Sequence, residues 1–199
     1  MTLCPADAPF VQFERWFAEA KAKEPALPEA MSLATASRDG APSTRLVLMK
    51  GVDRRGFVFY TNFESRKGEE LAANPRAALC FHWKSLLRQV RIEGAVEIVS
   101  AAEADAYFAT RPRGAQIAAW SSPQSQPYGE RTELEARLRD TESRFGASGP
   151  VSRPPFWSGY RVVPTLFEFW EDRPFRLHDR IEFRRSGLGA AWNKTRLYP

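Results

Sequence analysis

Residues 31–50 read MSLATASRDGAPSTRLVLMK, two largely apolar runs on either side of a short polar segment. The runs 31–37 and 43–50 have strand character because apolar and β-branched residues recur in both. Between them lies Arg38-Asp39-Gly40, and Asp-Gly is typical of the tight turn in a β-hairpin. The stretch therefore predicts two antiparallel strands joined by a turn.

Segments of the same kind extend outward from this hairpin. We expect residues 57–61 to follow a second turn and to continue the hairpin as a three-stranded meander. Strand character returns in 76–83, 88–99, 157–170, 175–184 and 191–197. Helical spacing or composition marks 10–23, 65–73, 101–110, 114–120 and 130–145. Antiparallel strands interrupted by a block of helices predict an α+β domain, mainly β, around a barrel or curved sheet.

The composition sets limits on the class of protein. The chain has 199 residues, 43% of them hydrophobic, which suits one globular domain over 1–199 with a mobile N-terminus at 1–8. No apolar run approaches the ~20 residues of a membrane span, and no secretory leader is recognisable, so we expect a cytoplasmic protein without a membrane partner. Two cysteines and two histidines argue against a metal site. No glycine-rich motif of the Rossmann or nucleoside-triphosphatase type is found.

Positive charge is concentrated in two short stretches, whereas the 29 basic and 24 acidic residues are otherwise interspersed. Ser65-Arg66-Lys67 places two cations at the start of an expected helix, where the helix dipole favours an anion. If residues 175–184 are extended, Arg176, His178 and Arg180 lie on one face of a sheet. A phosphate-bearing ligand would satisfy both clusters, and a solvated basic face is the alternative.

Eight motifs, in this order, resemble those of the pyridoxamine 5′-phosphate oxidase family, and the resemblance covers about residues 9–199. The motifs are Arg45-Leu-Val-Leu-Met-Lys50, Phe59-Tyr60-Thr61-Asn62, Ser65-Arg66-Lys67-Gly68, Arg88-Gln89-Val90, Tyr107-Phe108 with Arg111-Pro112-Arg113, Gln124-Ser125, Glu168-Phe169-Trp170 and Arg176-Leu177-His178-Asp179-Arg180. The resemblance implies an FMN-binding split β-barrel of antiparallel strands with flanking helices. It also implies a homodimer with FMN at the subunit interface.

The site residues follow from the same resemblance. Arg66 and Lys67 are expected to hold the FMN phosphate, within a cofactor-binding set of Arg45, Leu46, Val47, Leu48, Met49, Lys50, Tyr60, Thr61, Arg66, Lys67, Gln89, Gln124, Ser125, Trp170 and Arg180. The substrate-binding set is Lys50, Tyr107, Arg111, Ala115, Arg176, Leu177 and His178, in which Lys50, Tyr107 and Arg111 hold a phosphate. Arg176 and His178 face the substrate ring and are the expected catalytic residues.

The implied reaction is the oxidation of pyridoxamine 5′-phosphate and pyridoxine 5′-phosphate to pyridoxal 5′-phosphate, with O₂ reduced to H₂O₂. Many relatives carry serine where this chain has Ala115, so one hydroxyl contact to the substrate phosphate is expected to be missing. That departure keeps open a related FMN oxidase with another substrate, as in phenazine biosynthesis. A non-enzymatic binder of flavin or single-stranded nucleic acid is the remaining alternative, but the aromatic residues lie at core-like positions and no nucleic-acid partner is expected.

Overall fold

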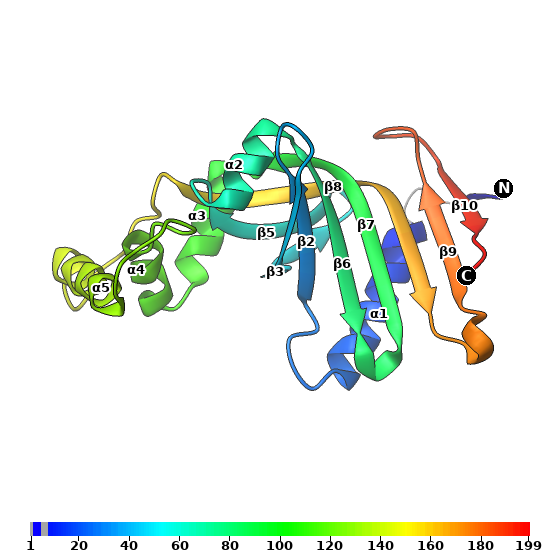
Figure 1. Ribbon diagram of the computed structural model, residues 1–199, viewed down its shortest axis with the longest axis horizontal. Coiled ribbons are helices and arrows are strands. Elements are labelled where there is room, and N and C mark those ends of the chain that lie inside the picture. The colour runs from blue at the N-terminus through cyan, green and yellow to red at the C-terminus, as the bar shows by residue number, and fades with distance from the viewer. Residues whose placement is uncertain (1, 5–7) are drawn as a thin grey trace.

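The computed structural model describes residues 2–4 and 8–199, and over these residues it contains ten strands and five α-helices (Figure 1). The strands are β1 (Thr2–Cys4), β2 (Ala30–Ala36), β3 (Pro42–Leu48), β4 (Gly51–Asp53), β5 (Gly56–Asn62), β6 (Arg76–Trp83), β7 (Arg88–Ile98), β8 (Trp157–Glu171), β9 (Asp179–Arg184) and β10 (Trp192–Arg196). The helices are α1 (Ala8–Lys23), α2 (Arg66–Ala73), α3 (Ala101–Thr110), α4 (Arg113–Ser121) and α5 (Arg131–Phe145), with 3₁₀ turns η1 (Lys84–Leu86) and η2 (Pro174–Arg176).

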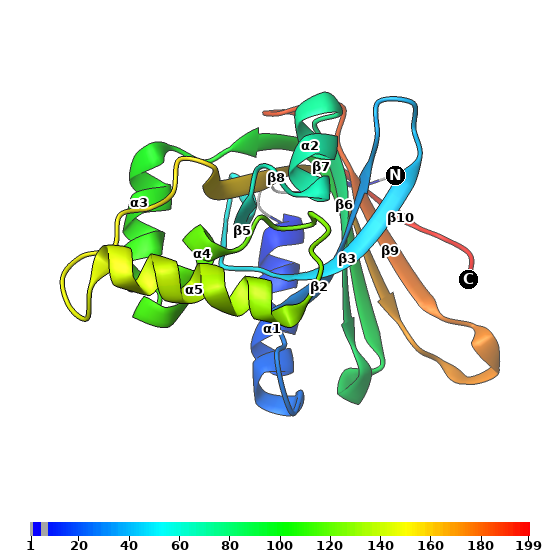
Figure 2. The same cartoon turned by 60° about the vertical axis from the view of Figure 1, so that its left-hand side comes forward.

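The strands form one curled antiparallel sheet in the order β1-β10-β9-β8-β7-β6-β2-β3 (Figures 1 and 2). The long strand β8 pairs with β7 along one edge, while its other edge is shared by two partners. Residues 157–162 pair with β5 and residues 166–171 pair with β9. Because two strands diverge from the same edge, the sheet curls into a half-barrel, which confirms the expected α+β class.

The expected meander of 31–37, 43–50 and 57–61 is wrong in its third strand. The hairpin of β2 and β3 forms in full register, from Ala30 opposite Leu48 to Ala36 opposite Pro42. However, β5 pairs with β4 and β8 instead of β3. Nearly every residue of β5 is buried, so this strand belongs in the interior and not at an edge with one solvated face.

The strand expected over 175–184 begins only at Asp179. Residues 174–176 form the 3₁₀ turn η2, and Phe175 and Arg176 have positive φ angles of 58° and 62°. Left-handed residues break the extended pleat, and Pro174 has no N–H to contribute to a ladder. The prediction that Arg176 shares a sheet face with His178 and Arg180 is therefore wrong.

The core is aromatic, and α1 supplies one side of it. Phe13 is fully buried and packs edge-on against Phe57 at 4.8 Å and Phe81 at 5.2 Å between ring centroids. Trp16, one turn later, packs edge-on against Phe169 at 5.3 Å. Thr2–Cys4 pairs with β10 and α1 begins at Ala8, while residues 1 and 5–7 lie outside the described part, so the expected mobility of residues 1–8 stays a prediction.

The block of helices packs beside one end of the sheet, with α4 and α5 side by side in both views (Figures 1 and 2). A second apolar cluster around Phe108, Ile117 and Trp157 ties α3 and α4 to the start of β8. No helix within 8–199 is long and apolar enough to cross a membrane.

Candidate functional site

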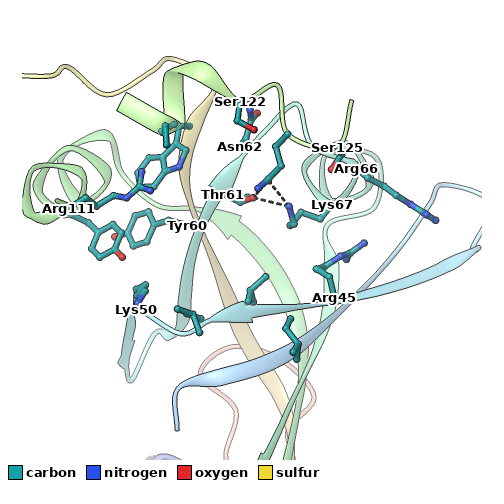
Figure 3. Close-up of a pocket in the computed structure, with 18 of the residues that line it drawn as sticks. Arg45, Lys50, Tyr60, Thr61, Asn62, Arg66, Lys67, Arg111, Ser122 and Ser125 are labelled. Atoms are coloured by element: carbon teal, nitrogen blue, oxygen red, sulfur yellow. Dashed lines mark hydrogen bonds between the residues drawn. The ribbon is translucent and has the colours of Figure 1, made fainter. Parts of the chain in front are cut away.

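A cavity of about 700 Å³ opens where the helical block meets β3 and β5 (Figure 3). Its lining comes from β3, β5, α2, α3, α4, the loop after α4 and the start of β8. The lining residues are Ser43, Thr44, Arg45, Leu46, Val47, Leu48, Lys50, Tyr60, Thr61, Asn62, Arg66, Lys67, Tyr107, Arg111, Ala118, Ala119, Ser122, Gln124, Ser125 and Trp157. Five of these residues are cations, and none of the described lining residues is a carboxylate. The cavity is therefore suited to an anionic ligand.

The cations fall into two groups at opposite ends of the cavity (Figure 3). Arg45, Arg66 and Lys67 lie together at one end, and Lys50 and Arg111 lie at the other. One elongated ligand with a single anionic group would use only one end. The arrangement thus accommodates two anionic groups.

The first turn of α2 forms one wall of the cavity. Ser65 is the N-cap, and its buried hydroxyl accepts a hydrogen bond from the Gly68 N–H. A Cβ atom at Gly68 would lie 2.1 Å from the Phe63 carbonyl oxygen, so only glycine lets the helix approach this loop. The cap and the glycine fix where Arg66 and Lys67 stand, at the positive end of the helix dipole.

Lys67 is buried, with only 8% of its surface exposed. Its Nζ donates hydrogen bonds to Ser65 Oγ at 3.0 Å, Thr61 Oγ1 at 3.1 Å and Gln124 Oε1 at 2.7 Å. Burial and the nearby Arg45 guanidinium lower the pKa of Lys67 from 10.5 to about 8. A negative ligand group beside Nζ would remove this electrostatic cost.

Arg111 lies on an aromatic platform at the other end of the cavity. Its guanidinium is 4.8 Å from the Trp157 ring centroid, and Tyr60 stacks on Tyr107 with 3.9 Å between centroids. Burial lowers the pKa of Arg111. The NH1 group of Arg111 and the Nδ2 group of Asn62 are buried without a hydrogen-bond partner among the described residues. Since buried donors are normally paired, both indicate an acceptor supplied by a ligand.

Strand β3 forms the outer wall, and it is the last strand of the sheet on this side. Leu46 is 73% exposed and lines the cavity together with Val47 and Leu48. Met49 does not line the cavity, because its side chain is buried in the main core. Ala115 lies in α4 one turn before Ala118 and Ala119, is half-buried, and does not line the cavity either.

The other expected site residues form a second group, far from the cavity. They are Gln89, Trp170, Arg176, Leu177, His178 and Arg180, on β7, β8, η2, β9 and the loop between them. Figures 1 and 2 place the η2 hairpin at the opposite side of the molecule from α4 and α5. Gln89 stands opposite Trp170 in the β7–β8 ladder, and the rings of Trp170 and His178 are 4.6 Å apart. Within one chain, the sequence-predicted site is therefore split in two.

Neighbouring carboxylates contact two polar side chains of the second group. Nδ1 of His178 accepts a hydrogen bond from the Arg173 N–H at 3.2 Å and lies 2.9 Å from Asp172 Oδ1. Arg180 Nε donates to Glu168 Oε1 at 2.7 Å. Leu177 is 68% exposed and Phe175 is 92% exposed. Such exposure of large apolar side chains is typical of a surface covered by another molecule.

Sequence reasoning did not assign Ser43, Thr44, Asn62, Ala118, Ala119, Ser122 or Trp157 to the site. It also missed Glu70, which lies behind the cavity wall and contacts Arg66 and Arg45. The signal for Glu70 was available, because a glutamate four residues after Arg66 lies on the same face of a helix. Asn62 ends the motif Phe59-Tyr60-Thr61-Asn62, but its sequence alone gives no reason for a buried donor.

Two family models match the chain. The model described as "Pyridoxamine 5′-phosphate oxidase" matches residues 17–145, and "Pyridoxine 5′-phosphate oxidase C-terminal dimerisation region" matches residues 157–199. A "Pyridoxine/pyridoxamine 5′-phosphate oxidase" from Nitrobacter winogradskyi is 62% identical over 98% of this chain and 91% of its own. A protein of the same name from Gluconobacter oxydans is 58% identical over 96% of this chain and 94% of its own.

Solved structures give the same picture of the fold. PhzG from Burkholderia lata 383, in complex with tetrahydrophenazine-1-carboxylic acid, has a TM-score of 0.88 and 31% identity over 100% of this chain and 98% of its own. A pyridoxamine 5′-phosphate oxidase-related, FMN binding protein from Nostoc punctiforme has a TM-score of 0.74 over both full chains. Its identity is 17%, so this second likeness concerns the fold alone. The expected split-barrel fold is confirmed.

Proposed function

Because the chain belongs to the pyridoxamine 5′-phosphate oxidase family, we propose that it oxidises pyridoxine 5′-phosphate and pyridoxamine 5′-phosphate to pyridoxal 5′-phosphate. A flavin is the cofactor that the family indicates, and FMN is the flavin we propose, with O₂ as the oxidant and H₂O₂ as its product. The observation that carries the proposal is the separation of the cavity's cations into two groups, one for each phosphate.

FMN fits the residues at the Lys67 end. Arg45, Arg66 and Lys67 supply the charge for its phosphate, and Lys67 loses the cost of its burial when that anion is bound. The unpaired Asn62 Nδ2 supplies a donor to a polar edge, and the side chains of β3 supply an apolar wall. When bound, FMN accepts the hydride from the substrate carbon, which no side chain could do.

The substrate fits the Arg111 end. Arg111 and Lys50 neutralise its phosphate, and the unpaired NH1 of Arg111 gains an acceptor. The Arg111 guanidinium packs over the Trp157 ring, and this contact restricts the orientation of the guanidinium before the substrate binds. Because this phosphate is remote from the reacting carbon, holding it orients that carbon and lowers the entropic part of the barrier.

Proton handling falls to Arg176 and His178, which we propose come from a second subunit. The match of residues 157–199 to a dimerisation region indicates a homodimer. Exposed Leu46 and Leu177 and the unpaired edge of β3 support an interface that joins the cavity of one chain to the second group of the other, with FMN between them. Asp172 and the Arg173 N–H both contact Nδ1 of His178, which leaves Nε2 to face the substrate's amine or hydroxyl.

A related FMN oxidase acting on a phenazine-type substrate is the second candidate, favoured by the structural likeness to PhzG. Lys50 and Arg111 argue against it, because two cations suit the two negative charges of a phosphate better than the single charge of a phenazine carboxylic acid. The identity of 62% to a vitamin B6 enzyme, against 31% to PhzG, points the same way.

The test is a substrate comparison on purified protein loaded with FMN. We expect pyridoxine 5′-phosphate and pyridoxamine 5′-phosphate to yield pyridoxal 5′-phosphate and H₂O₂ under air. The matched controls are pyridoxine and pyridoxamine, which lack the phosphate and should react at least about a hundredfold less efficiently if two charge-assisted contacts are lost. Equal efficiency with and without the phosphate, or no reaction of an FMN-loaded dimer, would refute the proposal.

A further inference from the structure

A buried carboxylate lies directly behind the Lys67 end of the cavity. Glu70, in α2, is 7% exposed and does not line the cavity. Its Oε1 accepts a hydrogen bond from Arg66 Nε at 2.9 Å, and its Oε2 accepts one from Arg45 NH2 at 3.3 Å. One carboxylate thus joins two cavity cations that come from a helix and a strand.

Two hydroxyl groups complete the network. Ser43 Oγ donates to Glu70 Oε2 at 2.6 Å, and Thr35 Oγ1 donates to the same oxygen. Each hydroxyl also accepts a hydrogen bond from Arg45, Thr35 from NH1 and Ser43 from NH2. Every partner therefore has a definite donor or acceptor role, and Arg45 can adopt only a narrow range of positions.

Glu70 is ionised at neutral pH. Burial acts to raise its pKa, but the hydrogen bonds from Ser43, Thr35, Arg66 and Arg45 lower it to about 2. The negative charge offsets part of the repulsion among Arg45, Arg66 and Lys67. The bond to Arg66 uses Nε and leaves the two terminal nitrogens for a ligand.

We propose that Glu70 is a positioning residue that holds Arg45 and Arg66 as a preorganised pair for the phosphate of the cofactor. The inference rests on the proposed function and adds a residue that does not itself touch the ligand. Preorganised cations bind an anion more tightly because fewer side-chain rotamers are lost on binding.

If Glu70 is a positioning residue, its removal changes the affinity for an anion in the direction opposite to the one that Coulomb attraction alone gives. Removing a negative charge next to an anion site should strengthen anion binding if charge alone mattered. If Glu70 positions the two arginines, its removal should weaken binding despite the more favourable net charge. The direction of the change therefore decides between the two effects.

The experiment compares Glu70→Gln with Glu69→Gln in apoprotein, using FMN and riboflavin as ligands and flavin fluorescence as the readout. Both substitutions remove one negative charge from α2, but Glu69 is exposed and outside the network. We expect Glu70→Gln to raise the Kd for FMN roughly tenfold, since charge-assisted contacts are disturbed, while the Kd for riboflavin, which lacks the phosphate, changes less than about twofold. We expect Glu69→Gln to leave the FMN Kd within about twofold.

Thr35→Val is a second variant for the case that Glu70→Gln does not fold. It deletes the bridging hydroxyl, keeps a β-branched side chain in β2, and alters no cavity-lining residue. Thr35→Val should also raise the Kd for FMN more than the Kd for riboflavin.

The inference is overturned if Glu70→Gln binds FMN as tightly as Glu69→Gln does. It is also overturned if Glu70→Gln raises the Kd values for FMN and riboflavin by the same factor. Wild-type apoprotein that binds FMN no more tightly than riboflavin would instead overturn the proposed function, and this inference with it.

Discussion

Raising the pH from 7 to 9 should weaken FMN binding about tenfold through the loss of one proton from Lys67. With a pKa of about 8 in the apoprotein, the protonated fraction of Lys67 falls from about nine-tenths to about one-tenth over this range. The bound phosphate favours the ammonium form, so binding must take up the missing proton. The same depressed pKa has the opposite effect on the apoprotein fold, whose stability should rise as the pH increases from about 8 towards 10.5, because the unfolded chain then binds more protons.

The assay is the FMN Kd of apoprotein at several pH values up to 9, because burial raises the pKa values of the cavity tyrosines Tyr60 and Tyr107 and both stay neutral over this range. Lys67→Arg is the matched control, since an arginine stays protonated throughout. Its absolute affinity for FMN need not equal that of the wild type, but its pH profile should be flat. A flat wild-type profile, or an equal slope in Lys67→Arg, would show that Lys67 does not carry this proton.

Two further predictions concern the helices around the cavity. Because Ala115 does not line the cavity, Ala115→Ser should change neither KM for pyridoxine 5′-phosphate nor kcat appreciably, and a lower KM in steady-state assays would show that this face of α4 does reach the substrate phosphate. Gly68→Ala should destabilise the protein by about 1–3 kcal/mol, because the new Cβ would lie 2.1 Å from a backbone oxygen that cannot rotate away. Gly114→Ala is its control in thermal unfolding, since nothing lies within 4 Å of that Cβ, and equal melting temperatures for the two variants would argue against the close approach at Gly68.

Local signals were sufficient for most of the helices and strands. The predicted range 101–110 is α3 as observed, because Ser100 and Glu103 form a capping box at its start. The pairing of β5 was missed because a hairpin turn reports only on neighbours in sequence, whereas β5 pairs with β8 about a hundred residues later. The left-handed residues Phe175 and Arg176 were missed because neither is a residue type that favours positive φ.

The site shows the same division between local and distant information. Arg66 and Lys67 could be recognised because cations at the start of a helix are locally unfavourable, and both line the cavity. The resemblance to the oxidase family is confirmed, and it supplied the remaining site residues. The spacing of Arg66 and Glu70 could be recognised in the sequence, but the contact of Glu70 with Arg45 could not, because Arg45 lies on another element that only the fold brings within 3.3 Å. The split of the expected residues into two groups was equally invisible, since sequence order carries no information on which chain completes a site.

That split has a genetic meaning in the proposed dimer. Two inactive alleles can complement each other if one is damaged in the cavity, as by Arg66→Ala, and the other in the second group, as by Arg176→Ala. In a mixed dimer, one site then combines the intact cavity of one chain with the intact second group of the other chain. The other site contains both damaged parts and is inactive. With random pairing of equal amounts, about a quarter of all sites are whole. Two alleles that are both damaged in the cavity, or both in the second group, give no intact site. The pattern of complementation among alleles would therefore show which residues of a site come from the same chain.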